Sequence, residues 1–463
     1  MSNFEINGFS GDMDRYLDII HSQNKEWNTI PSHYYAEYNV KRGLRNADGT
    51  GVLAGLTSIG EVHGYILDEG DKTPIDGKLR YRGIDVEDIV AHCQAEKRFG
   101  FEETAFLILF GFLPSQDILT DFSKMLAAAR PLPGEFTEDM ILKAPSKNIM
   151  NKLGRSILAL YSYDDNPDDI SLPNLLQQSI QLIARFPVLI ANSYACKRHY
   201  FDNESLVLHN PNPDLSAAEN FLYMIRPDNK FTALEAEILD LTMTLQAEHG
   251  GGNNSAFAVH VLSSTGTDTY SAISGAVGSL KGPKHGGAND KMLSQMTEIK
   301  ENVKNWEDEN EVLEFLKKII KKEAGDGKGL IYGMGHAVYT ISDPRAVILK
   351  ERAEYLAVQT GNEKEFKLHD LIERLAPVAF REIKGIDKAM CANVDFYSGF
   401  VYQMLGIPQE LITPIFAMSR IVGWCAHRIE EVMTGTKIIR PAYRSTVKRI
   451  HYTPLSERET PQG

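Results

Sequence analysis

Helix signals dominate this chain and leave little room for a sheet-based fold. Two complete capping boxes stand out, because Ser216 is followed by Glu219 and Thr232 is followed by Glu235. The second box predicts a helix that runs toward His249. Its apolar residues recur at helical spacing: Leu234, Ile238, Leu241 and Leu245. Glycines 250–252 are expected to end this helix.

Other segments support the same interpretation. In EVLEFLKKIIKK one helix face is apolar and the other carries lysines. Thr413-Pro414 predicts a helix N-terminus, and that helix is expected to end before Gly435. The segment HGYILDEGDKTPIDGKLRYRG reads as a small hairpin with its turn at Asp76-Gly77. With little other β signal and no alternation of strands and helices, we predict an all-α fold with one small β-hairpin near the N-terminus.

Chain length and net charge limit the classes of function that the protein could have. The 463 residues suffice for a large core and a second domain. Lys and Arg total 49 against 62 Asp and Glu, and the resulting charge of -13 disfavours binding to nucleic acid or to a membrane. No apolar run is long enough to span a bilayer, and the acidic N-terminus does not resemble a signal peptide, so we expect a cytoplasmic protein. Anionic substrates would need cations placed locally.

Four segments combine glycine with polar residues that carry chemistry. They are AEHGGGNNS (247–255), KGPKHGGAND (281–290), YGMGHAVYTISDPR (332–345) and NVDFYSG (393–399). Glycine beside histidine allows a ligand close to the backbone. A lone histidine is more often structural, but three such contexts together favour a site. His249, His260, His285 and His336 offer imidazoles, yet no H-E-x-x-H or closely spaced ligand pair occurs, so no metal site is expected. The four distant cysteines predict neither a zinc ribbon nor a disulfide framework.

In order and spacing, these segments resemble the citrate synthase family over roughly residues 40–450. RGLRNADGTGVLAGLT, LRYRGID and IIRPAYR add to the resemblance. It implies a homodimer of helical subunits in which a small domain closes over the substrates. It also implies a large domain at residues 41–287 with 395–463 and a small domain at 288–394, and residues 1–40, which precede the resemblance, are expected to form an N-terminal arm.

The resemblance also implies a role for each matching residue. His285 would hydrogen-bond the thioester oxygen of acetyl-CoA, and Asp395 would remove the α-proton. His336 would polarise the ketone of oxaloacetate, which His249 would also bind. Three arginines would hold carboxylates, the last of them reaching into the partner subunit's site: Arg345, Arg420 and Arg440. Acetyl-CoA would be a co-substrate, and no permanently bound cofactor is expected.

These roles suit the chemistry. A carboxylate with a pKa of about 3.9 is a poor base for a thioester α-proton. A neutral His285 that donates to the forming enolate oxygen would lower that barrier, and closure would exclude water. A planar guanidinium matches a carboxylate in bidentate geometry.

The sequence departs from the family pattern where basic residues often follow the equivalent of His336. Ala337 and Thr340 stand there, so we expect Lys284 and Lys328 to meet the phosphates of coenzyme A instead. Four alternatives to citrate synthesis stay open: a 2-methylcitrate synthase that uses propionyl-CoA, a citryl-CoA-cleaving lyase, an inactive paralogue that acts as a binding protein, and a metal-dependent hydrolase.

Overall fold

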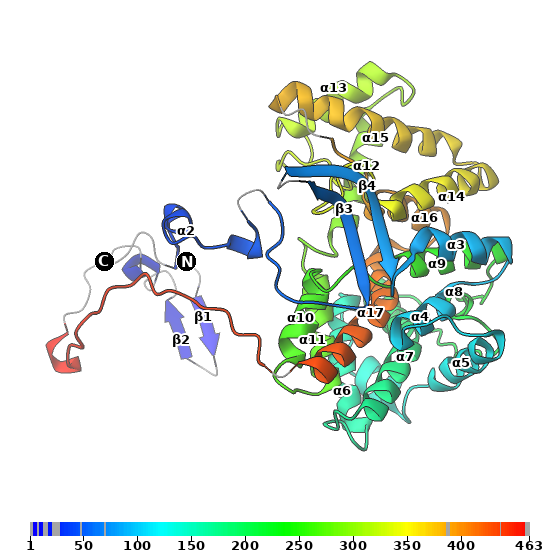
Figure 1. Ribbon diagram of the computed structural model, residues 1–463, viewed down its shortest axis with the longest axis horizontal. Helices are drawn as coiled ribbons and strands as arrows, with labels where there is room; N and C mark the ends of the chain where they lie inside the picture. Colours follow the sequence, from blue (N-terminus) through cyan, green and yellow to red (C-terminus); the bar gives the residue numbers. More distant parts are fainter. Residues whose placement is uncertain are drawn as a thin grey trace. The chain divides into compact units, whose positions relative to one another are not determined.

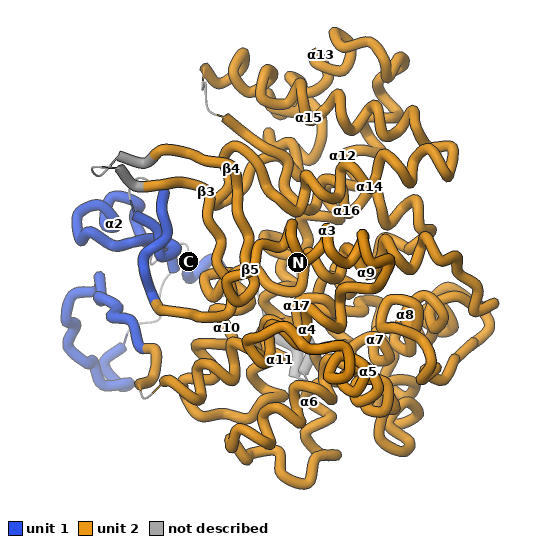
Figure 2. The backbone as a smooth tube through the Cα atoms, turned by 45° about the vertical axis from the view of Figure 1, so that its right-hand side comes forward, with its two compact units in different colours: residues 1–54, 440–463 blue, residues 55–439 orange. Residues whose placement is uncertain are grey.

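The computed structural model divides the chain into two compact units, residues 1–54 with 440–463 and residues 55–439 (Figure 2). It describes residues 3–6, 9–12, 17–20, 28–46, 49–68, 71–385, 389–435 and 437–458. The unit formed by residues 1–54 with 440–463 is called unit 1, and the unit formed by residues 55–439 is called unit 2. The predicted arm falls in unit 1, apart from those of its residues that lie outside the described ranges.

Unit 1 contains an antiparallel pair of short strands that the sequence reading did not anticipate. Strand β1 (Asn3–Ile6) pairs with β2 (Phe9–Asp12). The Asn7-Gly8 dipeptide between them is a strong hairpin signal that would have predicted the pair. The other elements of unit 1 in the described residues are a short helical stretch at 17–20, helix α2 (His33–Glu37) and two 3-10 turns, Arg42–Leu44 and Leu455–Glu457.

Unit 2 is built mainly from helices, as Figure 1 shows. Its three strands form one antiparallel sheet in the order β3 (Gly60–Asp68), β4 (Asp71–Tyr81), β5 (Ile84–Asp85). In the described residues its α-helices are α3 (Val86–Ala95), α4 (Phe101–Phe110), α5 (Gln116–Ala129), α6 (Ile149–Leu160), α7 (Leu172–Asp202), α8 (Ala217–Ile225), α9 (Ala233–Gln246), α10 (Asn254–Ser263), α11 (Thr269–Lys281), α12 (Ala288–Asn302), α13 (Glu309–Ile320), α14 (Pro344–Thr360), α15 (Glu363–Lys384), α16 (Val394–Met404) and α17 (Ile412–Thr434). A π-helical segment (Thr137–Leu142) and two 3-10 turns (Tyr161–Tyr163 and Gln409–Leu411) accompany them. The predicted largely helical fold is confirmed.

The local helix predictions are mostly confirmed. Both capping boxes form, at the N-termini of α8 and α9. Helix α13 buries the expected apolar face, and α17 ends before Gly435. The cap predicted at Thr413 is wrong, because α17 starts earlier and the Thr413 hydroxyl donates to the carbonyl oxygen of Gly286 at 3.1 Å.

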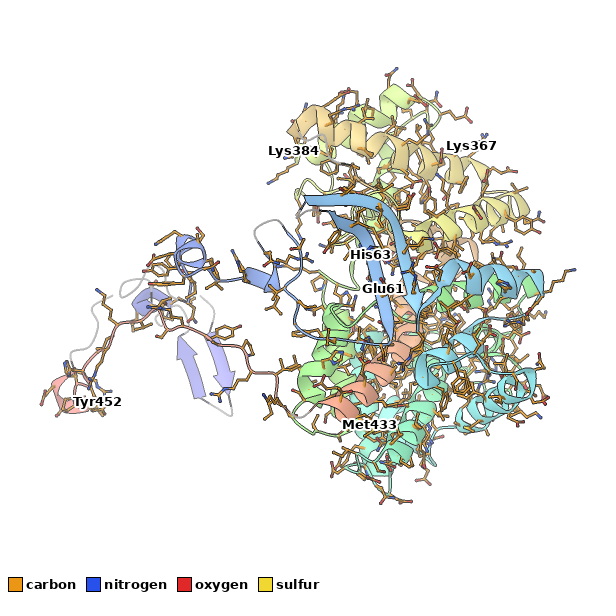
Figure 3. All side chains as sticks on the ribbon, in the orientation of Figure 1. Glu61, His63, Lys367, Lys384, Met433 and Tyr452 are labelled. Carbon is orange, nitrogen blue, oxygen red and sulfur yellow. The ribbon has the colours of Figure 1, made fainter. Side chains whose placement is uncertain are left out.

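The hairpin is confirmed, but its predicted turn is wrong. Asp68 pairs with Asp71, so Asp76-Gly77 lies inside β4. There the Ser342 hydroxyl contacts the Asp76 carboxylate at 2.9 Å and accepts from the amide of Gly77 at 3.1 Å. A Cβ at Gly77 would lie 2.2 Å from the carbonyl oxygen of Ser342. This glycine therefore serves the close approach of the loop that carries His336, and not a turn. Figure 3 labels Glu61 and His63 on the neighbouring strand β3.

Helix α17 forms the centre of the core and packs against α4, α7, α9, α10 and α11. Nearly every residue from Ile412 to Arg428 is buried, including the large Trp424 side chain. Two arginines are buried on the same helix, Arg420 and Arg428. Such burial is costly for a cation without a partner, so each needs a reason in the surrounding structure.

Helices α12 to α16 form the other part of unit 2, with α13 packed on α15 and α14 on α16 (Figure 1). This part includes most of the predicted small domain, whose separate movement stays a prediction. The four cysteines are free and buried. Of the helices in the described residues, none is long and apolar enough to cross a bilayer.

Candidate functional site

The two histidines expected to bind oxaloacetate lie against each other although they are far apart in sequence. The ring centres of His249 and His336 are 5.2 Å apart in an edge-to-face arrangement. His249 lies three residues beyond the end of α9 and is buried. Tyr339 stacks on His336 with ring centres 4.6 Å apart and also meets the edge of His249. These three rings therefore pack together in the candidate site.

The backbone around His336 fixes both its position and its tautomer. Gly333, at φ +82°, lies against Phe396, and its carbonyl oxygen accepts from the amide of Asn393 at 2.9 Å. The loop is therefore tied to the segment that carries Asp395. His336 Nδ1 accepts from the amides of Val338 and Tyr339, both at 3.1 Å. A neutral His336 must then carry its proton on Nε2, which makes that atom a donor.

Asp395 lies in the first turn of α16, where the Asn393 side chain caps the helix. The side-chain amide of Asn289, on α12, donates to Asp395 Oδ1 at 3.3 Å. Burial raises the pKa of Asp395 to about 6, although Arg345 and the Asn289 hydrogen bond oppose the rise. The carboxylate is thus a stronger base than an exposed aspartate and is still ionised at neutral pH.

His285 lies in the turn between α11 and α12. Its Nε2 atom is 3.1 Å from the hydroxyl oxygen of Ser255, which also accepts from the Trp424 indole at 3.1 Å. Burial, assisted by Arg420, lowers the pKa of His285 to about 4. The imidazole is therefore neutral at physiological pH and able to act as a hydrogen-bond donor without carrying charge.

Of the arginines in this group, Arg420 has the most side-chain donors left to bind a ligand. It is 1% exposed, and its Nε donates to the carbonyl oxygen of Gln246 at 2.7 Å. Its Nη1 and Nη2 atoms are buried and have no hydrogen-bond partner among the described residues. Burial, reinforced by Arg345, lowers the pKa of Arg420 to about 10. Two unsatisfied donors on a buried cation are expected where an anionic ligand binds.

Arg345 differs, because a carboxylate already occupies part of its guanidinium group. Its Nε and Nη2 atoms donate to Asp343 at 3.0 and 2.7 Å, and both side chains are buried. Burial alone would lower the pKa of Arg345, but the charge of Asp343 and these hydrogen bonds raise it. A substrate carboxylate would therefore share Arg345 with Asp343.

The electrostatics place these groups in one neighbourhood. Burial lowers the pKa of His249 well below its usual value, and further lowering comes from Arg345, His336, Arg420 and His285. His249 Nε2 is buried without a partner among the described residues. Six of the nine predicted residues thus form one group: His249, His285, His336, Arg345, Asp395 and Arg420.

The remaining three predicted residues are all exposed. Arg440 is exposed and belongs to unit 1, and Lys284 is exposed in the turn before His285. Lys328 is exposed and lies 3.9 Å from the Asp326 carboxylate, which Lys291 also approaches at 3.9 Å.

The sequence reading missed four residues that the geometry brings into the site: Ser255, Asn289, Tyr339 and Asp343. All four fall within the segments that it singled out, but their neighbours are glycines and histidines whose chemistry is more conspicuous. Only the contacts to His285, Asp395, His336 and Arg345 distinguish them from ordinary loop residues.

Comparison with known proteins gives one consistent result. The family model described as citrate synthase, C-terminal domain, matches residues 47–442. A citrate synthase from Haloferax volcanii is 33% identical over 405 residues, covering 86% of this chain and 98% of that protein. A 2-methylcitrate synthase from Shewanella oneidensis is 32% identical over 367 residues, covering 79% and 87%.

A solved structure agrees. The ternary complex of carboxymethyl coenzyme A and oxaloacetate with citrate synthase from Thermoplasma acidophilum matches with a TM-score of 0.73 and 27% identity. The match covers 90% of this chain and 99% of that one. The chain therefore belongs to the citrate synthase family of enzymes.

Proposed function

We propose that this enzyme catalyses citrate synthesis, in which acetyl-CoA, oxaloacetate and water give citrate and CoA. The observation that carries the proposal is the buried Arg420, whose two uncommitted donors adjoin a general base and neutral histidines. The names of the relatives and the bound molecules of the Thermoplasma acidophilum enzyme support the same reaction.

The first step needs a base and a donor that act together. Asp395 would take an α-proton from acetyl-CoA while neutral His285 donates a hydrogen bond to the thioester oxygen as it becomes an enolate oxygen. The Ser255 hydroxyl has one proton and reaches two acceptors, His285 Nε2 at 3.1 Å and Asn253 Oδ1 at 2.8 Å. When that proton points to His285, the neutral ring carries its own proton on Nδ1, which is then the donor.

The second step forms the carbon–carbon bond. The enolate carbon would attack the ketone carbon of oxaloacetate while His336 Nε2–H transfers its proton to the ketone oxygen. Water would then hydrolyse the thioester of citryl-CoA, releasing citrate and CoA. Arg420 and Arg345 would hold the oxaloacetate carboxylates, and Arg440 would contribute from the partner subunit of a homodimer.

Coenzyme A carries phosphates that need cations outside this buried group. Lys284 and Lys328 are our candidates, and both are exposed. Lys328 also lowers the pKa of Lys291, which means that two positive charges lie close together there. Such a pair would attract a polyanion despite the chain's net charge of -13. The predicted small domain, closure and a cytoplasmic location belong to this proposal as well.

The acyl preference separates the two nearest functions. One methylene is worth about 1–3 kcal/mol in a pocket, so acetyl-CoA and propionyl-CoA should differ about 10–200-fold in kcat/KM. The test compares both with oxaloacetate as second substrate, following thiol release. A higher kcat/KM for propionyl-CoA would favour the 2-methylcitrate synthase. Cleavage of citryl-CoA without condensation would favour the lyase, and no turnover would favour the inactive paralogue. Loss of activity after chelation would favour the metal-dependent hydrolase only if hydrolysis itself were observed.

A further inference from the structure

Two histidines outside the proposed reaction lie in direct contact. His260 is on α10 and His427 is on α17, and His260 Nε2 is 3.1 Å from His427 Nδ1. The outer nitrogen of each ring faces a carboxylate: His260 Nδ1 lies 2.7 Å from Glu431, and His427 Nε2 lies 3.0 Å from Glu248. Both rings are thus oriented so that their inner nitrogens converge.

This arrangement needs a positive centre between the rings. If each outer nitrogen donates its hydrogen to the facing carboxylate, a neutral ring presents a lone pair at its inner nitrogen. Two lone pairs 3.1 Å apart repel each other, so either a proton or a metal ion must lie between them. Two nitrogens bound to tetrahedral Zn²⁺ at ~2.0–2.1 Å would be about 3.3 Å apart, close to the observed separation.

A third ligand atom points to the metal. Glu430 Oε2 is buried and faces His427 Nδ1 at 3.8 Å. The other oxygen of Glu430 accepts from the amide and hydroxyl of Ser58 at 2.7 and 2.8 Å, which holds the carboxylate in place. The ligand atoms of His260, His427 and Glu430 all lie within 4.8 Å of one another.

Space for an ion exists beside the two nitrogens because residue 251 is a glycine. A Cβ at Gly251 would lie 3.2 Å from His260 Nε2 and 3.7 Å from His427 Nδ1. A Cβ at the neighbouring Gly252 would meet no atom within 4 Å. Gly251 therefore leaves open the volume that faces both inner nitrogens, and Gly252 supplies a matched control.

We propose that His260, His427 and Glu430 bind one divalent transition-metal ion, such as Zn²⁺, with Glu248 and Glu431 as outer carboxylates. Two imidazoles and a carboxylate are ligands that Zn²⁺ accepts, and carboxylates commonly orient zinc-bound histidines in this way. The ion would join α10 to α17 and, through Glu248, to the turn that carries His249. It would be structural and take no part in the condensation, so the proposal does not rest on the proposed function.

This proposal revises the absence of a metal that the sequence suggested. That expectation relied on closely spaced ligands, whereas His260 and His427 are 167 residues apart. They become neighbours only because α10 packs against α17. A motif search along the sequence therefore has no means of finding this site.

The test titrates Zn²⁺ into the full-length, metal-stripped protein in competition with a chromophoric chelator. We expect one tightly bound Zn²⁺ per chain, and a Co²⁺ derivative with the visible spectrum of a four-coordinate site. His260→Gln and Gly251→Ala should remove this binding, and Glu431→Gln should weaken it about 10–100-fold. Gly252→Ala and His92→Gln, at an exposed histidine, should bind as the parent does.

Three results would overturn the proposal. A parent chain that loses all Zn²⁺ to the chelator would show that a proton, and not a metal, bridges the pair. Parental affinity in both His260→Gln and Gly251→Ala would place any bound Zn²⁺ elsewhere, as would equal losses in the two control variants. Far-UV circular dichroism of each metal-free variant shows whether it is folded. Should His260→Gln fail to fold, Gly251→Ala and Glu431→Gln still decide the question.

Discussion

Asp395→Asn should stabilise the protein while it abolishes catalysis, because holding this partly buried carboxylate in its charged form destabilises the folded state. Burial raises the pKa of Asp395 to about 6 in the folded chain, against about 3.9 when unfolded. The folded state therefore binds the proton more tightly, and its stability falls as pH rises between these values. About two pKa units correspond to ~3 kcal/mol above pH 6, and the same relation gives roughly 1.5 kcal/mol at pH 5.

An asparagine avoids this cost at every pH, since its amide is neutral and its oxygen still accepts from Asn289. We therefore expect Asp395→Asn to gain up to about 3 kcal/mol in the free energy of unfolding at pH 7.5 and about half as much at pH 5. Urea denaturation at both pH values, at equal chain concentration, measures this difference. Asp165→Asn, at an exposed position, controls for the loss of one negative charge. A gain that is absent, or that does not grow with pH, would refute the inferred desolvation of Asp395.

Three further predictions test the substrate contacts. Arg420→Leu should raise the KM for oxaloacetate about 10–100-fold, because one or two charge-assisted hydrogen bonds are lost; an unchanged KM in steady-state kinetics would remove Arg420 from the site. Arg440→Ala mixed with Asp395→Asn should regain activity after subunit exchange, because one site of each heterodimer would be intact; proven heterodimers without activity would place Arg440 in its own subunit's site. The KM for acetyl-CoA should rise with salt more steeply than that for oxaloacetate, and Lys284→Ala or Lys328→Ala should reduce that slope with kcat nearly unchanged; parental slopes would exclude both lysines.

Local signals in the sequence predicted local structure well. The capping boxes at Ser216 and Thr232 form as expected, because their hydrogen bonds span only three residues. The prediction of a turn at Asp76-Gly77 is wrong because the amide of Gly77 donates to the hydroxyl of Ser342, which is 265 residues away in the sequence. The cap predicted at Thr413 is wrong for the same reason, a contact with a residue distant in the sequence. The Thr413 hydroxyl donates to the carbonyl oxygen of Gly286 and does not cap its own helix.

The candidate site was likewise predicted only in part: its residues were identified, but the contacts that hold them were not. The six residues now found together were identified by their resemblance to family motifs, which carry long-range information that periodicity lacks. What the motifs did not convey is how each group is held: Asp343 occupies part of Arg345, whereas Arg420 keeps two free donors. The His260–His427 pair likewise depends on the packing of two helices, so no short segment encodes it.

Citrate formation by the purified chain, measured together with CoA release, tests the central claim most directly. We predict that acetyl-CoA and oxaloacetate give one citrate for each CoA released. Asp395→Asn should lower kcat by about 10²–10⁴, the usual effect of losing a general base, although it remains folded. CoA release without citrate, or an Asp395→Asn variant that keeps kcat within about tenfold of the parent, would contradict the account.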